Sequence, residues 1–358
     1  MERIVDEKRG DLPGSEGGLN QPPKCWCGNI DLLSFCREFA RCPTCETLVF
    51  AQIPGPEIAQ VTDDERAFYG RTYWFAHMER DLGLSNIVVR SRKDLPERCL
   101  YWLHTVLKYK LPPSRVLELG SGHGGFVALL RWAGFDATGL EVSPWVVEFA
   151  RTKFNVPMLL GPVEDQQIAP GSLDVIALMD VFEHLADPAG TIRHCLGLLK
   201  PDGLLIIQTP RYPEGKTYEE MVTQRDGFLD HLKPIEHVYL FSQHSIREFF
   251  TRLGCQYVQF EPPIFPHYDM FLVVGRAPLA ARSPEAMSAA LRPIPTRRLV
   301  QAFLSVDRLA RLPVVERHRG MSRILRRMER LTFRLLWNVV PSLPKGSRMT
   351  HRTLRQAR

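Results

Sequence analysis

A glycine-rich loop has the residue types and spacing of a nucleoside-cofactor site. The stretch RVLELGSGHGGF, residues 115–126, places Gly120, Gly122 and Gly125 at G-x-G-x-x-G spacing directly after an apolar run. Glycines in this pattern let the backbone turn tightly and approach a ligand closely. Glu141 follows about 20 residues later, where a carboxylate can accept hydrogen bonds from ribose hydroxyls. These features fit NAD and other adenosine cofactors equally well.

The acidic residue Glu118 separates these cofactors by charge. It lies two residues before Gly120, at the mouth of the loop. A carboxylate there repels the pyrophosphate of NAD, but it attracts an ammonium group. S-adenosylmethionine carries an ammonium and a sulfonium and has no phosphate, so the sequence favours this cofactor. The alternatives are a solvated strand-end carboxylate for Glu118 and a purely structural turn for the glycines.

Four of the eight cysteines form two close pairs. Cys25 and Cys27 in KCWCGN are followed by Cys42 and Cys45 in RCPTCE. Two thiolate pairs can make a tetrahedral zinc site, which folds a segment too small to build its own core. The first pair is C-x-C where C-x2-C is usual, so Cys36 is a possible replacement ligand and ordinary reduced cysteines are the alternative. A closed four-thiolate site would be structural.

Alternating strands and helices must position the glycine loop. Strands are expected at 115–119, 136–142, 156–161, 172–180, 203–210, 255–262 and 270–277, and helices at 124–134, 143–154, 188–200 and 242–254. Near-continuous apolar strands separated by helices indicate a parallel sheet that is buried on both faces. Ligands of such a sheet lie beyond the carboxyl ends of its strands. Ser143 is expected to cap the second of these helices, with Pro144 at its first position.

Several motifs resemble, in order, those of class I S-adenosylmethionine-dependent methyltransferases. They are VLELGSGHGGF, GLEVSPWVVEFA, SLDVIALMDVFEHLADP and LKPDGLLIIQTP, and HVYLFSQHSIREFFTRLGC is also similar to a segment common in that superfamily. The resemblance runs from about Arg115 to Arg276. It implies an α/β, Rossmann-like sheet of seven strands with the last one antiparallel. The zinc-ribbon-like module ahead of this core is similar to that of bacterial sugar and natural-product methyltransferases.

The resemblance also implies which residues hold the cofactor. Glu118, Gly120, Ser121 and Gly122 would contact its methionine end, Glu141 and Val142 the ribose, Val163 and Glu164 the adenine, and Met179 and Asp180 would lie beside the transferable methyl group. Pro162 stands where many relatives have an acidic residue, which leaves Glu164 or Asp165 for the adenine contact.

Two histidines could act on the methyl acceptor. Methyl transfer is an in-line displacement at a sulfonium carbon, so the protein must align the acceptor and, for a hydroxyl, remove a proton. An imidazole with a pKa near ~6.5 suits this work, and His184 and His237 are the candidates, with a structural role as the alternative for each. Tyr69, Tyr73 and Trp74 could cap the cofactor pocket, although such aromatic residues often pack a core.

The net charge of +6 hides an acidic body and a basic tail. From Arg276 to the end there are 19 Lys and Arg residues against 4 Asp and Glu residues. Arginines interleaved with Leu, Phe and Trp are typical of helices on a membrane surface. The alternative is that the tail forms solvated helices that cover the core. Nucleic acid is not favoured as a partner, because the sequence has no recognition motif beside the charge. No apolar run approaches the roughly 20 residues that span a bilayer, and the N-terminus lacks a secretory apolar region. A cytoplasmic location is therefore expected, either free in the cytoplasm or peripheral to the membrane.

The sequence thus predicts five segments. They are a disordered leader at 1–23, a zinc-ribbon-like module at 24–50, a helical linker or cofactor cap at 51–110, a class I methyltransferase domain at 111–277 and a basic helical tail at 278–358. The favoured function is O-methylation of a sugar or metabolite hydroxyl. The alternatives are C-methylation of a nucleotide sugar, a binding protein with a vestigial methyltransferase core, and an NAD-dependent oxidoreductase.

Overall fold

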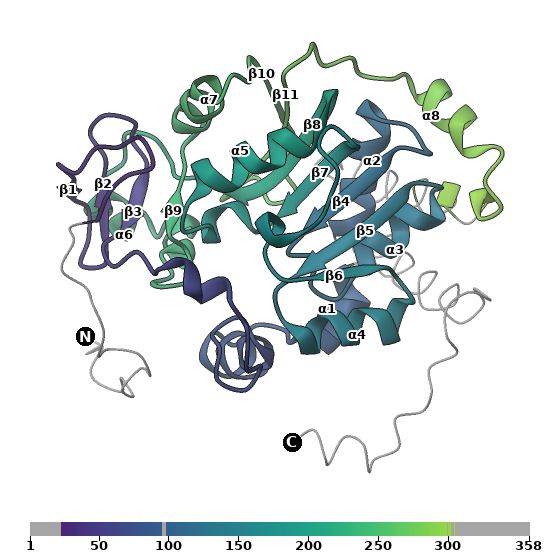
Figure 1. Cartoon of the computed structure of the whole chain (residues 1–358). Helices are drawn as coiled ribbons and strands as arrows, with labels where there is room; N and C mark the ends of the chain where they lie inside the picture. Colours follow the sequence, from purple (N-terminus) through teal and green to yellow (C-terminus); the bar gives the residue numbers. More distant parts are fainter. Residues whose placement is uncertain (1–22, 95–97, 299, 302–303, 305–358) are drawn as a thin grey trace, which may run out of the picture.

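A seven-stranded sheet is the frame of the molecule (Figure 1). Its strands, in spatial order, are β10 (Tyr257–Glu261), β11 (Asp269–Gly275), β8 (Leu199–Pro210), β7 (Leu173–Met179), β4 (Arg115–Leu119), β5 (Asp136–Glu141) and β6 (Met158–Leu160). β11, the last strand in the chain, runs antiparallel to the other six strands of this sheet. The structure is a computed structural model that describes residues 23–94, 98–298, 300–301 and 304. It confirms the predicted fold class and the antiparallel last strand.

Apolar side chains bury both faces of this sheet. Alternate residues of β4 point to opposite sides, so Val116 joins one core and Leu117 the other. The first core is shared with α2 (Leu100–Tyr109), α3 (Gly125–Trp132) and α4 (Pro144–Phe154), and the second with α5 (Pro188–Leu198) and α7 (Gln243–Arg252). The predicted helix start at 143 is confirmed, because the Ser143 hydroxyl accepts a hydrogen bond from the Val146 N–H at 3.1 Å.

The cysteine segment builds a second, smaller sheet beside the α5 and α7 face. Its strands are β1 (Leu33–Ser34), β2 (Phe39–Arg41), β3 (Leu48–Phe50) and β9 (Tyr239–Leu240). β9 comes from far along the chain and pairs antiparallel with β3. Trp26 packs edge-on against Phe249 of α7, with ring centroids 4.9 Å apart. The cysteine segment is therefore continuous with the core of the large sheet.

The segment between the two sheets is less helical than expected. The predicted helical stretch 63–110 begins with turns and forms three helices, η2 (Tyr73–Asp81), α1 (Ile87–Asp94) and α2. The remaining short elements are η1 (Pro56–Ala59), η4 (Val163–Asp165), η5 (Phe182–His184), α6 (Tyr218–Gln224) and η6 (Gly227–His231). Asp64 joins the segment to the start of α4 by accepting hydrogen bonds from the Ser143 hydroxyl and from the Trp145 N–H.

The described part of the basic tail packs on the core. Helix α8 (Pro284–Leu291) buries Met287 and Leu291 in the first core, and Val300 joins them. The predicted leader and the tail beyond residue 304 lie outside the described residues. Within the described residues, none of the helices has the length and apolar character that crossing a membrane requires.

Candidate active site and cysteine centre

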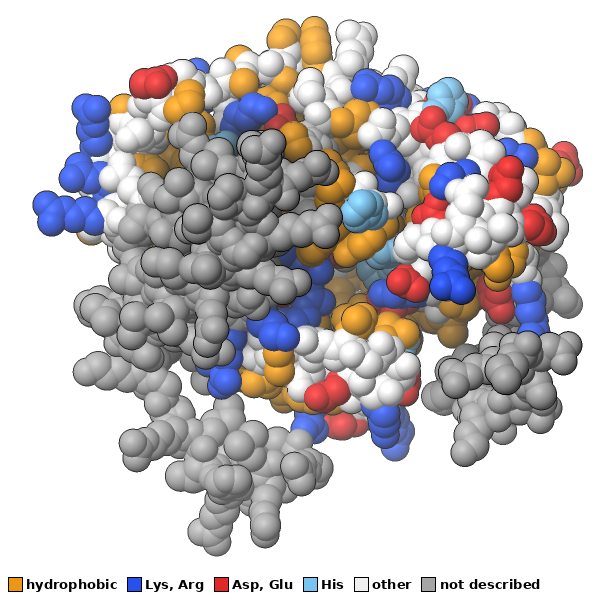
Figure 2. Space-filling model, turned by 180° about the vertical axis from the view of Figure 1, so that it is seen from behind, with side chains coloured by type: hydrophobic (Ala, Val, Ile, Leu, Met, Phe, Trp, Pro, Cys, Tyr) orange, Lys and Arg blue, Asp and Glu red, His pale blue; other side chains and the backbone are white. Residues whose placement is uncertain are grey.

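The carboxyl ends of β4, β5 and β7 open into one cavity of about 1380 Å³. This is the edge at which parallel sheets bind their ligands. Every residue that the sequence singles out for the cofactor lines this cavity: Glu118, Gly120, Ser121, Gly122, Glu141, Val142, Val163, Glu164, Met179 and Asp180. The molecule seen from behind is hollowed in its middle, where hydrophobic and histidine side chains gather (Figure 2).

The glycine loop needs its glycines for conformation and for space. Gly120 and Gly122 have φ angles of +59° and +49°, which favour glycine. A Cβ on Gly120 would lie only 2.5 Å from a methyl carbon of Val181. The loop is held by Glu141, whose two carboxylate oxygens accept the N–H groups of Gly122 at 3.0 Å and Val142 at 2.8 Å. Glu141 therefore joins the loop to the end of β5 and still lines the cavity.

Glu118 is a buried carboxyl group with an incomplete set of partners. Its exposed fraction is 3%, and its Oε2 has no hydrogen-bond partner among the described residues. Burial, and then the nearby charge of Glu141, raise the pKa of Glu118 well above its usual range. A buried carboxylate is stabilised by a cationic partner and destabilised without one. The chemistry of this position therefore fits the ammonium group of S-adenosylmethionine.

Asp180 has a partner that sequence reasoning missed. Its Oδ2 lies 2.5 Å from Nη1 of Arg98, and its Oδ1 accepts a hydrogen bond from the Gln208 side chain at 2.8 Å. Asp180 also has a φ angle of +56°, a strained value for an aspartate. Arg98 lies outside every motif in the sequence, so only the fold brings it to the end of β7.

The two predicted catalytic histidines lie side by side in the wall of the same cavity. The ring centroids of His184 and His237 are 5.0 Å apart, and both rings line the cavity. His237 Nδ1 donates to the backbone oxygen of His231 at 2.8 Å, which leaves the lone pair on Nε2. Burial lowers the pKa of both histidines, and for His237 the neighbouring His184 adds to this effect. Both imidazoles are therefore neutral near pH 7.

The buried carboxylate of Glu236, the residue before His237, binds side chains of η2. It accepts hydrogen bonds from the Tyr73 hydroxyl at 3.0 Å and from His77 Nε2 at 2.8 Å, and Lys233 Nζ lies 3.4 Å away. Burial opposes its charge, but the hydrogen bond from His77 and the positive charge of Lys233 hold the pKa of Glu236 below its usual range. Tyr69, Tyr73 and Trp74, which the sequence suggested as a cap, all line the cavity.

The sequence held one signal for the acidic residues beside the histidines. His184 and His237 each follow a glutamate, in FEH and IEH, and both glutamates are buried next to the cavity. The prediction from the sequence named the two histidines and neither glutamate. The repeated Glu-His pair would have brought Glu183 and Glu236 into the candidate site.

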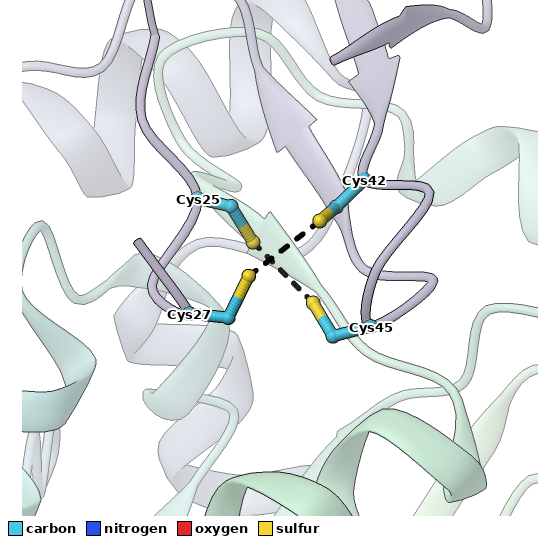
Figure 3. A group of neighbouring side chains, drawn as sticks. All are labelled: Cys25, Cys27, Cys42 and Cys45. Atoms are coloured by element: carbon cyan, nitrogen blue, oxygen red, sulfur yellow. Dashed lines mark hydrogen bonds between the residues drawn. The ribbon is translucent and has the colours of Figure 1, made fainter. Parts of the chain in front are cut away.

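The four predicted cysteine ligands converge on one point (Figure 3). Sγ of Cys25 lies 3.4 Å from Sγ of Cys45, and Sγ of Cys27 lies 3.6 Å from Sγ of Cys42. Four sulfurs at Zn–S distances of about 2.3 Å would lie about 3.8 Å apart in a tetrahedron, so the cluster has nearly the size of a zinc site. Cys36, the possible replacement, is not in the cluster. The donor set and its geometry therefore fit a structural zinc ion.

The central part of the chain matches a known family. Residues 91–260 match the family described as "Methyltransferase domain". This part of the chain is therefore similar to methyltransferase domains. The match covers the glycine loop, both β4 and β7, and both predicted catalytic histidines.

Curated relatives are similar over part of the methyltransferase domain. The chain is 33% identical over 128 residues to the ubiquinone biosynthesis O-methyltransferase of Xanthomonas campestris pv. campestris (strain 8004), covering 32% of this chain and 54% of that protein. The corresponding protein of Xanthomonas euvesicatoria pv. vesicatoria is 34% identical with the same coverage. The chain thus spans about half the length of the curated relatives it matches.

Solved structures are similar at low sequence identity. A chain of the complex between the Haloferax volcanii Trm112 methyltransferase activator and the putative methyltransferase is 19% identical, with a TM-score of 0.42 over 53% of this chain and 94% of that chain. A possible histamine N-methyltransferase from Thermotoga maritima is also 19% identical, with a TM-score of 0.39 over 55% of this chain and 97% of that chain.

Proposed function

We propose that this chain transfers the methyl group of S-adenosylmethionine to a hydroxyl group of a small molecule, a sugar or another metabolite. One observation carries the proposal: a single cavity is lined by the buried carboxyl group of Glu118, whose Oε2 has no hydrogen-bond partner among the described residues, and by the neutral imidazoles of His184 and His237. We call the part of the cavity that these two imidazoles border the acceptor half. Its volume of about 1380 Å³ exceeds the ~300–1,000 Å³ of common ligand pockets, which leaves room for a cofactor and an acceptor together.

The chain's own residues divide the work between the two halves. Glu118 would hold the ammonium of the cofactor beside Gly120, Ser121 and Gly122; Glu141 and Val142 would lie by the ribose, Val163 and Glu164 by the adenine, and Met179 and Asp180 by the methyl group. When bound, S-adenosylmethionine supplies a methyl group already activated by its sulfonium centre. The remaining tasks of the protein are to align the acceptor and to help its hydroxyl lose a proton.

The imidazoles of His184 and His237 are the proposed catalytic groups for that second task. As the acceptor oxygen forms its bond to the methyl carbon, the carbon–sulfur bond breaks and its electron pair stays on sulfur. The hydroxyl proton must leave the oxygen in the same process. The two neutral imidazoles border the acceptor half, where they can activate that hydroxyl.

The flanking segments have proposed supporting roles. Residues 24–50 would bind one structural zinc ion through Cys25, Cys27, Cys42 and Cys45, and residues 51–110 would cover the cavity of the methyltransferase domain that begins near residue 111. The names of the curated relatives, which are O-methyltransferases of ubiquinone biosynthesis, support a hydroxyl acceptor over a carbon acceptor.

Calorimetric titration of the purified chain with S-adenosylmethionine, S-adenosylhomocysteine and NAD tests the cofactor. We expect binding of the first two only, weakened by Glu118→Gln and Glu141→Ala and unchanged by the exposed control Glu219→Gln. Binding of NAD alone would contradict the proposal. A panel of sugars, nucleotide sugars and phenols, assayed by S-adenosylhomocysteine release, then tests the acceptor, and mass spectrometry with NMR of the product separates O-methylation from C-methylation.

A further inference from the structure

Three side chains of the acceptor half form a cluster with the composition of a metal site. One ligand atom from each of Glu183, His184 and His237 lies within 4.8 Å of the others. Glu183 Oε1 is 3.8 Å from His184 Nε2. Glu183 and His184 lie in η5, and His237 lies in the segment before β9. A backbone hydrogen bond of 2.8 Å, from the Val238 N–H to the Glu183 carbonyl oxygen, joins these two segments. The backbone therefore fixes the cluster.

Each of the three side chains also has a polar contact through its other oxygen or nitrogen atom, the one that is not offered to the ion. The Thr209 hydroxyl donates to Glu183 Oε2 at 2.9 Å, the Tyr69 hydroxyl lies 3.2 Å from His184 Nδ1, and His237 Nδ1 donates to the His231 oxygen at 2.8 Å. Metal-binding histidines usually have their other nitrogen held in this way, which orients the ring. Glu183 Oε1 and the Nε2 atoms of both histidines remain for a ligand.

The charges around the cluster favour a cation. Besides Glu183, the carboxyl groups of Asp180, Glu236 and Asp269 border the same part of the cavity, against the basic side chains of Arg98 and Lys233. Oδ2 of Asp269 is buried and has no hydrogen-bond partner among the described residues. Four carboxyl groups thus face two basic groups around the two imidazoles, and a bound divalent cation would offset this excess.

We propose that Glu183, His184 and His237 bind a divalent transition-metal ion in the acceptor half of the cavity. Two imidazoles and one carboxylate suit ions such as Zn²⁺, Fe²⁺, Co²⁺ or Mn²⁺. Three protein ligands leave coordination positions open toward the cavity, unlike the four-sulfur centre. The proposal that an ion binds is argued from the cluster alone, whereas the proposal that the ion acts in methylation rests on the proposed function.

A bound ion would change how the two imidazoles act. With both Nε2 atoms bound to the ion, neither can take a proton, so they serve as ligands. The acceptor oxygen would take an open position, where the cation would lower the pKa of the bound hydroxyl. Its proton would pass to water as the oxygen–carbon bond forms, and the carbon–sulfur bond would break with its electron pair left on sulfur. The proposal thus predicts acceptors that present an oxygen to the ion.

Titration of the full chain with Mn²⁺, followed by the EPR signal of free Mn²⁺, tests the site. Mn²⁺ prefers oxygen and nitrogen over thiolate ligands, so the zinc of the cysteine centre, measured first by metal analysis, stays in place. We expect one saturable Mn²⁺ site per chain, with affinity lowered at least tenfold by Glu183→Gln and by His237→Gln. His194→Gln, which changes an imidazole elsewhere in the cavity, should keep the affinity within about twofold. Circular dichroism and thermal unfolding establish that each variant is folded.

Two outcomes would overturn the metal site: no saturable binding of Mn²⁺ or Co²⁺, or binding that both substitutions leave unchanged. Methylation at the same rate with and without added ion would overturn its role in catalysis, and the proposed function would stand. Failure to bind S-adenosylmethionine would instead remove the proposed function while leaving the Mn²⁺ count intact. Calorimetry therefore tests the proposed function and EPR tests the metal site, and either proposal can be refuted without the other.

Discussion

The cysteine centre and the Glu183 cluster are both candidate metal sites, but they differ in how many ligands they offer and in how far the fold encloses them. Cys25, Cys42 and Cys45 are buried in the same core as α5 and α7, and the four sulfurs of the centre lie within 4.8 Å of one another. The Glu183 cluster offers three ligand atoms at the wall of a large cavity. The first arrangement stabilises a fold, and the second leaves positions at which a small molecule can bind.

The two centres are also joined through the backbone. Strand β3 of the cysteine segment pairs with β9, and the Phe50 N–H donates to the Val238 oxygen at 2.9 Å. The Val238 N–H in turn donates to the backbone carbonyl oxygen of Glu183. The closed centre therefore supports the segment before β9, which brings His237 to the open centre. The predictions below separate the two centres and then test this support.

Loss of one sulfur should have the largest effect. Cys45→Ser should reduce the zinc content from about one ion per chain to near zero, because the remaining three thiolates no longer close the site. Loss of a structural metal belongs to the costly class of substitutions, about 3–5 kcal/mol, so Tm should fall by about 10 °C. Metal analysis and thermal unfolding measure both quantities.

Cys36→Ser is the matched control for this change. Cys36 lies outside the cluster, so the variant should keep its zinc and lose at most about 1 kcal/mol of stability. Equal zinc loss in the two variants would show that the cluster seen in Figure 3 is not the zinc site. In Cys45→Ser, weaker Mn²⁺ binding by the chain that remains folded would demonstrate that β3 supports His237.

Glu118→Gln should separate cofactor binding from both metal centres. Removing the carboxylate charge should weaken S-adenosylmethionine binding by about 10–100-fold, since charge-assisted bonds contribute about 1.5–3 kcal/mol. Zinc content and Mn²⁺ affinity should not change, because Glu118 belongs to neither cluster. Unchanged calorimetric affinity for S-adenosylmethionine would mean that the ammonium lies elsewhere.

The same variant should be more stable than the wild-type chain without cofactor. Burial raises the pKa of Glu118 above its ordinary value of 4.5, so this carboxyl contributes stability below about pH 4.5 and loses it as the pH rises. The gain of Glu118→Gln should therefore be larger at pH 7 than at pH 5, at about 1 kcal/mol or more. Thermal unfolding at the two pH values measures this difference, and a gain that shrinks with rising pH would contradict it.

The sequence predicted what is local and missed what the fold assembles. The cysteine pairs, the glycine loop and the capped start of α4 each lie within a short stretch, so spacing and charge identified them. Arg98 reaches Asp180 only through the packing of the segment before α2. Likewise, no local pattern joins Glu183 to His237, because a long stretch of chain separates them and β9 brings them together.

Tyr69→Phe should weaken the open centre without removing a ligand. Its hydroxyl lies 3.2 Å from His184 Nδ1, and groups that hold a metal ligand commonly contribute 10–100-fold in affinity. EPR titration should show Mn²⁺ affinity lowered by about that factor. Tyr73→Phe is the matched control, because the Tyr73 hydroxyl donates to Glu236 instead. If both variants bind Mn²⁺ like the wild-type chain, the imidazole of His184 is not a ligand.

The smallest expected effect comes from Ser143→Ala, at the start of α4. The Ser143 hydroxyl caps this helix and donates to Asp64, so its removal should cost about 1 kcal/mol, or about 2–4 °C in Tm. Ser143 belongs to neither metal centre, so zinc content and Mn²⁺ affinity should stay at their wild-type values. A stability loss of this size with unchanged metal binding would show that the effects of Cys45→Ser and Tyr69→Phe on metal binding arise at the two centres. A drop in Mn²⁺ affinity here would instead mean that any loosening of the segment over the cavity disturbs the open centre.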